Sequence, residues 1–249
     1  EVWRTLALRC THHLNDSEVR GVVITHGTDT LEETAWFLHE VLDAAKPVVL
    51  TCAMRPATAL TPDGPQNLLD AVATVLAPGA TGVLAVAAGE VHGARHVQKV
   101  HPYRVNAFSS GDAGPLGWVE ESVVRWACNS PVVPVENTVG AMNNIVSAAT
   151  WPWVEIVMNH AGASGRAVDA LVREGVQGLV VACTGNGTIH HDLEAALVRA
   201  QNAGVRVVRS TRCAEGQVLP KPGDVLPASQ GLSPVKARVA LMLDLLRMH

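Results

Sequence analysis

Residues 21–34, GVVITHGTDTLEET, decide the fold, because they join a short apolar run to a polar turn and then to a helical pattern. The run 21–24 is apolar without alternation, which is typical of a strand buried on both faces. From Leu31 to Ala45, apolar residues recur at helical spacing. The turn 26–30 therefore joins a strand to a helix, and in open parallel sheets ligands bind at this end of the strands.

The alternation of strand and helix continues through most of the chain. Apolar strands are predicted at residues 46–54, 82–89, 154–159, 178–185 and 205–211, and helices at 67–76, 167–175, 192–204 and 233–248. Glycine and proline interrupt the pattern in 109–153, where we expect a strand or hairpin and then a linker. Apolar strands separated by helices indicate a parallel sheet covered on both faces. We therefore predict a two-lobed α/β protein with a larger N-terminal, flavodoxin-like parallel-sheet domain (1–120), a linker region (121–153) and a smaller C-terminal α/β domain (154–249).

The composition excludes several classes of protein. Of the 249 residues, 48% are hydrophobic and 17% are charged, as in a globular protein. The net charge of -4 is spread without a basic stripe, which argues against nucleic-acid binding and against a polybasic membrane patch. No apolar run in the sequence reaches the about 20 residues that a membrane-spanning helix needs. The five cysteines are scattered without CxxC spacing, so we expect free thiols and a cytoplasmic protein.

Eleven histidines raise the question of a metal site. His12–His13 and His190–His191 are adjacent pairs, whose side chains we expect to diverge on a helix and to alternate faces on a strand. No HExxH motif or similar spacing of ligands occurs in the sequence. We therefore predict that the chain has no metal site and needs no cofactor.

The turn 26–30 carries several polar groups. Thr30 and Glu33 form a capping-box pattern, which places Thr30 at the N-cap of the helix. Gly27 permits a close backbone approach or a positive φ. Thr28 offers a hydroxyl, and Asp29 offers a carboxylate that can hold an ammonium group.

Two interpretations of this turn stay open from its residues alone. Threonine and aspartate are preferred at any helix N-terminus, so a purely structural turn is one interpretation. A catalytic turn would need a group that takes the proton of a hydroxyl. His26 is one candidate by residue type, and a lysine is the other, provided that burial or charged neighbours tune its pKa.

The stretch VVITHGTDTLEETAWFL (22–38) resembles the second signature of the bacterial-type L-asparaginases, which are threonine amidohydrolases. Further strings follow in the order of that family: KPVVLTCAMRP (46–56), DGPQNLLDAV (63–72), ARHVQK (94–99), NAFSSGDAGPLG (106–117), GLVVACTGNG (178–187) and LSPVKARV (232–239). The resemblance covers essentially the whole chain. It implies hydrolysis of L-asparagine to L-aspartate and ammonia, often with activity on L-glutamine, in a homodimer or homotetramer.

The resemblance also assigns roles to residues of this chain. Thr28 would be the second active-site threonine, Lys99 the lysine that tunes it, and Asp29 the carboxylate between them. Such a threonine–lysine pair supplies the base that an alcohol needs in order to act as a nucleophile.

Substrate-binding roles follow from the same resemblance. Asp29 would also hold the α-ammonium group of the substrate, and Gly27 would lend backbone to its pocket. Ala53 would turn its backbone carbonyl toward the amide that is cleaved. Asp63 and Asn67, in DGPQN, are expected to be structural.

The sequence departs from the family pattern in three places. The family carries its first threonine in a TGGT-like turn, which these 249 residues lack. We expect that turn, its lid and any signal peptide to lie before Glu1, so that this chain holds half of the catalytic set and does not turn over substrate unaided. Thr188 stands where well-known members have an asparagine, and the loop 214–229, which contains Glu215, is shorter than the family loop that supplies a glutamate to the neighbouring subunit.

Two further functions stay open beside the asparaginase hypothesis. One is an asparaginase-like subunit that supplies ammonia to an amidotransferase. The other is a catalytically degenerate paralogue that binds amino acids. The presence of Thr28, Asp29 and Lys99 argues against the degenerate paralogue, and the missing first threonine argues for it.

Overall fold

The computed structural model describes residues 1–127 and 141–248. The chain divides into two compact units, Glu1–Val146 and Ser147–His249. Of the predicted linker 121–153, residues 128–140 lie outside the described part, as does Cys128. None of the described helices has both the length and the apolar character needed to cross a membrane.

The first unit is built on a six-stranded sheet in the order β1-β2-β3-β4-β7-β8. Its strands are β1 (Val22–Thr25), β2 (Val48–Thr51), β3 (Val83–Ala87), β4 (Glu90–Gly93), β7 (Gly117–Glu120) and β8 (Val123–Trp126). The first three strands are parallel, as predicted, whereas every pairing from β3 to β8 is antiparallel. The α/β class is confirmed, but the sheet is mixed rather than parallel throughout.

Two tight turns explain the antiparallel half of the sheet. Ala88 and Gly89, between β3 and β4, have φ angles of 53° and 77°. Glu121 and Ser122, between β7 and β8, have φ angles of 50° and 65°. Two consecutive residues with positive φ make the short turn whose twist suits an antiparallel hairpin. The chain therefore reverses at both places, where a crossover helix would have kept the strands parallel.

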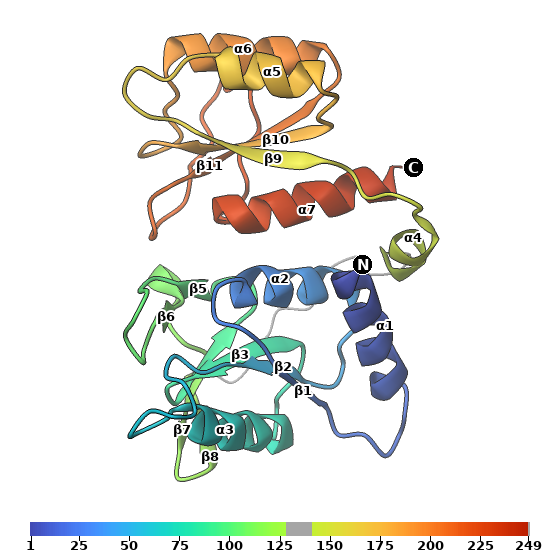
Figure 1. The fold of residues 1–249 in the computed structure, drawn as a ribbon, viewed down its shortest axis with the longest axis vertical. Helices are drawn as coiled ribbons and strands as arrows, with labels where there is room; N and C mark the ends of the chain where they lie inside the picture. The colour runs from blue at the N-terminus through green and yellow to red at the C-terminus, as the bar shows by residue number, and fades with distance from the viewer. Residues whose placement is uncertain (128–140, 249) are drawn as a thin grey trace. The chain divides into compact units, whose positions relative to one another are not determined.

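Helices cover both faces of this sheet. Figure 1 shows α2 (Leu31–Val41) on one face and α3 (Gly64–Leu76) on the other. An additional helix, α1 (Val2–Leu14), was not predicted from the sequence. Its Trp3 stacks on Phe37 of α2, with ring centroids 4.8 Å apart, and donates its indole N–H to Thr34 at 3.0 Å. The helix α1 is therefore fixed to α2.

A small hairpin lies outside the main sheet of the first unit. It consists of β5 (Gln98–Lys99) and β6 (Phe108–Ser109), which pair antiparallel as a separate two-stranded sheet. The 3-10 helix η1 (Gly111–Ala113) follows β6. At the end of β6, the hydroxyl of the buried Ser110 lies 2.9 Å from Nδ1 of the buried His92 on β4. The hairpin is thus anchored to the main sheet at one end.

The helix α4 (Ala141–Ser147) comes last in this part of the chain.

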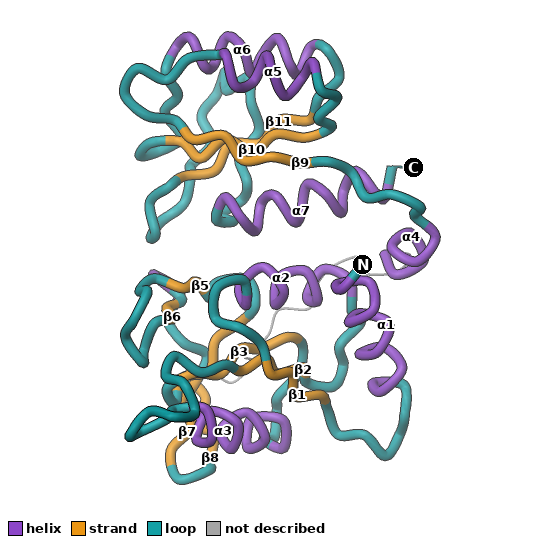
Figure 2. The backbone as a smooth tube through the Cα atoms, in the orientation of Figure 1, coloured by secondary structure: helices purple, strands orange, loops and turns teal. Residues whose placement is uncertain are grey.

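The second unit is a three-layered α/β structure, as predicted. Its parallel sheet has the order β11-β10-β9 and consists of β9 (Val154–Met158), β10 (Gly178–Cys183) and β11 (Arg206–Thr211). Figure 2 shows α5 (Arg166–Arg173) and α6 (His191–Asn202) on one face and α7 (Pro234–Arg247) on the other. Every residue of the central strand β10 is buried. That burial explains why its sequence is continuously apolar.

Asn67 and Asp63 hold the ends of two strands in the first unit. Asn67 donates its amide N–H to the carbonyl of Cys52 at 2.9 Å, and its Oδ1 accepts the N–H of Ala88 at 3.0 Å. Asp63 accepts the backbone N–H groups of Met54 and Arg55 at 2.9 and 2.8 Å. Cys52 and Ala88 directly follow β2 and β3, so one amide side chain ties the ends of both strands. Asp63 and Asn67 are therefore structural, as expected.

The surroundings of Asp63 favour its ionised form. Partial burial by itself would raise the pKa of the Asp63 carboxyl. The hydrogen bonds from the backbone of Met54 and Arg55 and from Asn67 outweigh this effect and lower the pKa below its ordinary value. The carboxylate thus stays charged and keeps the segment after β2 in place.

We predict that Asn67→Ala destabilises the protein by roughly 2–4 kcal/mol, because the buried carbonyl of Cys52 and the partly buried N–H of Ala88 each lose their partner. Chemical denaturation followed by tryptophan fluorescence measures the free energy of unfolding. Leu60→Ala is the control, since Leu60 is 99% exposed and its change should stay within about 0.5 kcal/mol of the wild type. Equal stability of Asn67→Ala and Leu60→Ala would contradict the structural role of Asn67.

Candidate active site

The candidate site lies at the carboxyl edge of the parallel strands. β1 and β2 pair in parallel with Thr25 opposite Thr51, and the N–H of His26 donates to the Thr51 carbonyl at 2.8 Å. The turn 26–30 therefore leaves the sheet beside the segment that contains Ala53. This edge is where ligands bind in open α/β sheets.

Lys99 joins this turn from the hairpin formed by β5 and β6. Its Nζ lies 2.8 Å from the Thr28 hydroxyl and 2.6 Å from Oδ1 of Asp29. The Thr28 hydroxyl also lies 3.4 Å from the same carboxylate oxygen. The structure thus brings together the three residues that the sequence analysis assigns to catalysis, although Lys99 is about seventy residues from the other two.

The two charged groups of this cluster differ in their exposure to water. The side chain of Lys99 is 16% exposed, whereas that of Asp29 is 89% exposed. The hydrogen bond from Lys99 and the positive charge of Lys99 lower the pKa of the Asp29 carboxyl below its ordinary value, and Thr28 adds to this effect. The contribution of this contact to folding stability is fully present above the pKa that Asp29 has in the unfolded chain. It is lost as the pH falls through the lower pKa that Asp29 has in the folded protein.

His26 and Thr30 do not have the roles that their residue types suggested. The Nδ1–H of His26 donates to the carbonyl of Gly27 at 2.7 Å, so Lys99, and not His26, meets the Thr28 hydroxyl. Thr30 is the N-cap residue of α2, as predicted, but its side chain makes no cap hydrogen bond. The Thr30 hydroxyl therefore does not make its half of the predicted capping box. The reason is the backbone of Thr30, whose ψ of 17° differs from the extended ψ of 136° at His190, where the side chain does cap its helix.

Gly27 and Ala53 present backbone at the same edge of the sheet. A Cβ added to Gly27 would meet no atom within 4 Å among the described residues, and the φ of Gly27 is not positive. Packing within the described chain therefore does not account for a glycine at this position. A Cβ added to Gly64 would lie 3.2 Å from the Cβ of Ala53, so Gly64 lets α3 begin close to Ala53.

Glu32 is a polar residue near this cluster that the sequence analysis did not identify. Its Oε2 accepts the backbone N–H of Lys99 at 3.1 Å. An acidic residue in the first turn of a helix is ordinarily explained by the helix dipole, so no pattern in the residues connects Glu32 with a lysine 67 residues away.

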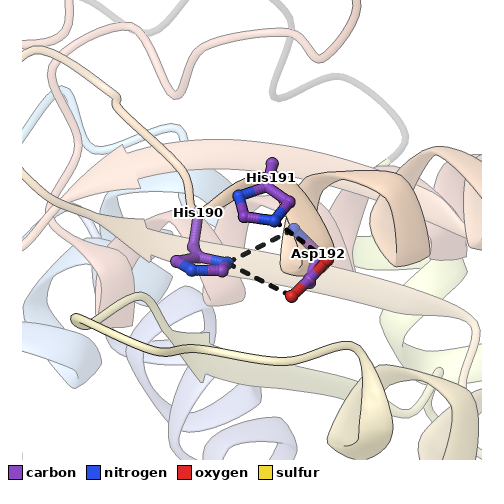
Figure 3. A group of neighbouring side chains, drawn as sticks. All are labelled: His190, His191 and Asp192. Atoms are coloured by element: carbon purple, nitrogen blue, oxygen red, sulfur yellow. Dashed lines mark hydrogen bonds and ion pairs between the residues drawn. The ribbon is translucent and has the colours of Figure 1, made fainter.

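His190, His191 and Asp192 form a group that could hold a metal ion. Figure 3 shows the three side chains at the start of α6, where their ligand atoms lie within 4.8 Å of one another. The two rings stack with centroids 4.3 Å apart, so the expected divergence of this pair is wrong; the rings of His12 and His13 are also close, at 5.2 Å. The extended backbone of His190 at the N-cap turns its ring toward the helix.

The local bonding of this group works against a cation. The N–H of Asp192 already donates to Nδ1 of His190 at 3.3 Å. The start of a helix also carries the positive end of its dipole. That the chain has no metal site stays a prediction.

We predict that Lys99→Met raises the pKa of the Asp29 carboxyl toward its ordinary value, because the hydrogen bond and the positive charge that lower it are both removed. A carbon-13 NMR titration of the aspartate carboxyl groups measures the change. Lys46→Met is the matched control, since Lys46 donates to the backbone carbonyl of Asp16 and to no carboxylate in the described contacts. An Asp29 pKa that is the same in both variants would contradict the contact with Lys99.

Comparisons with known proteins identify relatives of both units of the chain. Residues 1–131 match the family model described as "Asparaginase, N-terminal", and residues 153–248 match the "Glutaminase/Asparaginase C-terminal domain". The chain is 37% identical to L-asparaginase 2 of Bacillus subtilis strain 168 over 96% of this chain and 64% of that protein. It is 37% identical to L-asparaginase 2 of Escherichia coli K12, over 98% of this chain and 71% of that protein.

A solved structure has the same fold. The crystal structure of a probable cytoplasmic L-asparaginase from Campylobacter jejuni superposes with a TM-score of 0.89 at 38% sequence identity. The match covers 98% of this chain and 79% of that chain. Both family models, these relatives and this structure lead to one conclusion: the chain belongs to the asparaginase family.

Proposed function

We propose that the protein hydrolyses L-asparagine to L-aspartate and ammonia, with Thr28, Asp29 and Lys99 as its catalytic residues. The observation that carries this proposal is the position of the Lys99 Nζ, 2.8 Å from the Thr28 hydroxyl and 2.6 Å from Asp29. Membership of the asparaginase family supports the choice of substrate. L-Glutamine, whose side-chain amide is the same group, is the proposed second substrate.

The three residues suit an attack on an amide carbon. In its neutral form, Lys99 takes the proton of the Thr28 hydroxyl, and Asp29 stabilises the ammonium that results. The oxygen that loses the proton attacks the amide carbon, or it takes a proton from a water molecule that does so. The C–N bond then breaks, and the protonated Lys99 returns its proton to the leaving nitrogen, which departs as ammonia. On the first of these routes, water then attacks the carbonyl carbon of the ester formed with Thr28, the bond between that carbon and the Thr28 oxygen breaks, and the Thr28 hydroxyl regains its proton as L-aspartate leaves. On both routes, water supplies the oxygen of the new carboxylate.

The substrate-binding roles are part of the same proposal. The exposed Asp29 carboxylate can hold the α-ammonium group of an amino acid, in a charge-assisted hydrogen bond. Gly27 leaves room for the substrate backbone at the edge of the sheet, and Ala53 offers a carbonyl to the amide N–H₂.

The assembly and the compartment are also proposals. We propose a homodimer or homotetramer, which sedimentation analysis of the natural protein would test, with a monomer as the contradicting result. We propose the cytoplasm as its compartment. In support, Cys10, Cys52, Cys183 and Cys213 are free thiols in the part of the chain that the structure describes, as is usual in a reducing compartment.

We predict that Thr28→Ala and Lys99→Ala each reduce ammonia release from L-asparagine by at least about 100-fold, because each removes one partner of the proton transfer. The assay uses the natural gene product with whatever residues flank this chain, and circular dichroism checks the fold.

The chain offers a matched control for each variant. Thr30→Ala removes a neighbouring threonine hydroxyl that makes no cap hydrogen bond, and Lys46→Ala removes a lysine that contacts the Asp16 carbonyl. Both controls should keep nearly full activity. If the wild type releases ammonia and Thr28→Ala or Lys99→Ala does so at a nearly normal rate, these residues are misassigned. A wild type that releases no ammonia from L-asparagine would overturn the proposed function.

A further inference from the structure

We propose that Glu32 is a positioning residue, whose carboxylate fixes the backbone of Lys99 so that the lysine reaches Thr28 and Asp29. This inference rests on the proposed function, since it concerns how the same site is assembled. Its central observation is the hydrogen bond of 3.1 Å from the backbone N–H of Lys99 to Oε2 of Glu32.

The hairpin that carries Lys99 needs such an attachment. β5 has two residues and pairs with β6, outside the six-stranded sheet. The N–H of Val100 donates across the hairpin to the carbonyl of Ala107 at 2.8 Å. Because successive N–H groups of a strand point to opposite sides, the N–H of Lys99 points away from β6. Glu32 accepts this outward N–H and so connects the free edge of β5 to α2.

A second contact connects the same two segments one helical turn further along. The Arg95 guanidinium lies over the ring of Trp36, 5.6 Å from its centroid. Trp36 follows Glu32 by four residues on α2, so both project from the same face of that helix. The segment 95–99 is therefore attached to α2 at both of its ends, by Trp36 at Arg95 and by Glu32 at Lys99.

The helix α2 is a firm support for this attachment. Its Leu31, Trp36, Phe37 and Leu38 are each at most 3% exposed, so the helix is packed into the core of the first unit. The same helix begins directly after Thr28 and Asp29. The helix α2 thus continues the turn that bears the hydroxyl and the carboxylate, and its first turn holds the lysine backbone.

This arrangement accounts for the reach of the lysine side chain. The backbone of Lys99 is held at Glu32. Its Nζ reaches Asp29 and Thr28, which precede Glu32 by three and four positions in the chain. Without the hydrogen bond to Glu32, the Nζ would depend on its exposed partner Asp29, and an ion pair in water holds a long side chain weakly. A misplacement of about 1 Å in a catalytic group can lower the rate about 100-fold.

The test compares Glu32→Ala with Glu32→Gln in the natural protein. Glutamine keeps an oxygen that can accept the N–H of Lys99, whereas alanine has no acceptor. We expect Glu32→Ala to lower kcat about 10- to 100-fold, with a much smaller change in KM, and Glu32→Gln to stay within about threefold of the wild type. Glu194→Ala is the control for an acidic residue in the first turn of a helix, and it should keep full activity.

Two measurements separate positioning from a general structural role. Hydrogen exchange of the Lys99 amide should be faster in Glu32→Ala and unchanged in Glu32→Gln. The Asp29 pKa should rise in Glu32→Ala alone, because Lys99 would spend less time beside it. A Glu32→Ala variant that is folded and has a wild-type kcat would overturn the proposal. So would equal losses of activity in Glu32→Ala and Glu32→Gln.

Parallel assays of Thr28→Ala and Lys99→Ala distinguish this proposal from the proposed function. If these two variants stay fully active, the assignment of the catalytic residues is wrong and the catalytic meaning of Glu32 falls with it. If they lose activity while Glu32→Ala does not, the positioning role of Glu32 alone is wrong.

Discussion

The contact of the Lys99 ammonium with Thr28 and Asp29 is the interaction on which the candidate site depends. It joins a strand-to-helix turn to a hairpin about seventy residues further along the chain. Neither the turn nor the hairpin alone holds all the groups that a proton transfer from the hydroxyl needs. The turn has a hydroxyl and a carboxylate but no base, since the nearby His26 is engaged with the carbonyl of Gly27. The hairpin brings the nitrogen that can exchange a proton with that hydroxyl.

The parallel half of the sheet gives this contact a fixed frame. The register of β1 against β2 places the turn beside the segment of Ala53, and Asn67 ties the ends of β2 and β3 through Cys52 and Ala88. The antiparallel half supports the hairpin that carries Lys99. β4 carries His92, which contacts Ser110 at the end of the β5–β6 hairpin. Both halves of the mixed sheet therefore help to bring Lys99 to the turn.

The sequence predicted the features that depend on local patterns. Apolar runs and helical spacing located β1, β2, β3, α2 and the elements of the second unit. Burial on both faces explains the continuous apolar signal of β2, β3 and β10. The predicted burial of β1 on both faces is wrong, because β1 lies at the edge of its sheet and is only partly buried. The hairpin turns at Ala88–Gly89 and Glu121–Ser122 were missed, since three of these four residues are not glycine and positive φ is not visible in their letters. α1 was missed because its attachment depends on Trp3 meeting Phe37 across the fold.

The site divides in the same way between local and long-range information. The polar residues of the turn could be identified from their order after a strand, whereas Lys99 was identified through a resemblance to a family. Glu32 was found by neither route. Its partner is a backbone N–H, which every residue except proline possesses, so no residue type at position 99 indicates the contact.

The exposure of Asp29 limits what the ion pair with Lys99 can do by itself. A carboxylate that is 89% exposed keeps most of its hydration, and ion pairs of this kind contribute little to stability. The position of Lys99 must therefore come from the better-buried contacts of its backbone and from the helix that supports them. An amino acid bound over Asp29 would exclude water from the carboxylate and so strengthen the attraction of Asp29 to the ammonium group of the ligand. The Asp29 carboxylate would therefore bind an ammonium group more strongly when a ligand covers it than when it is open to water.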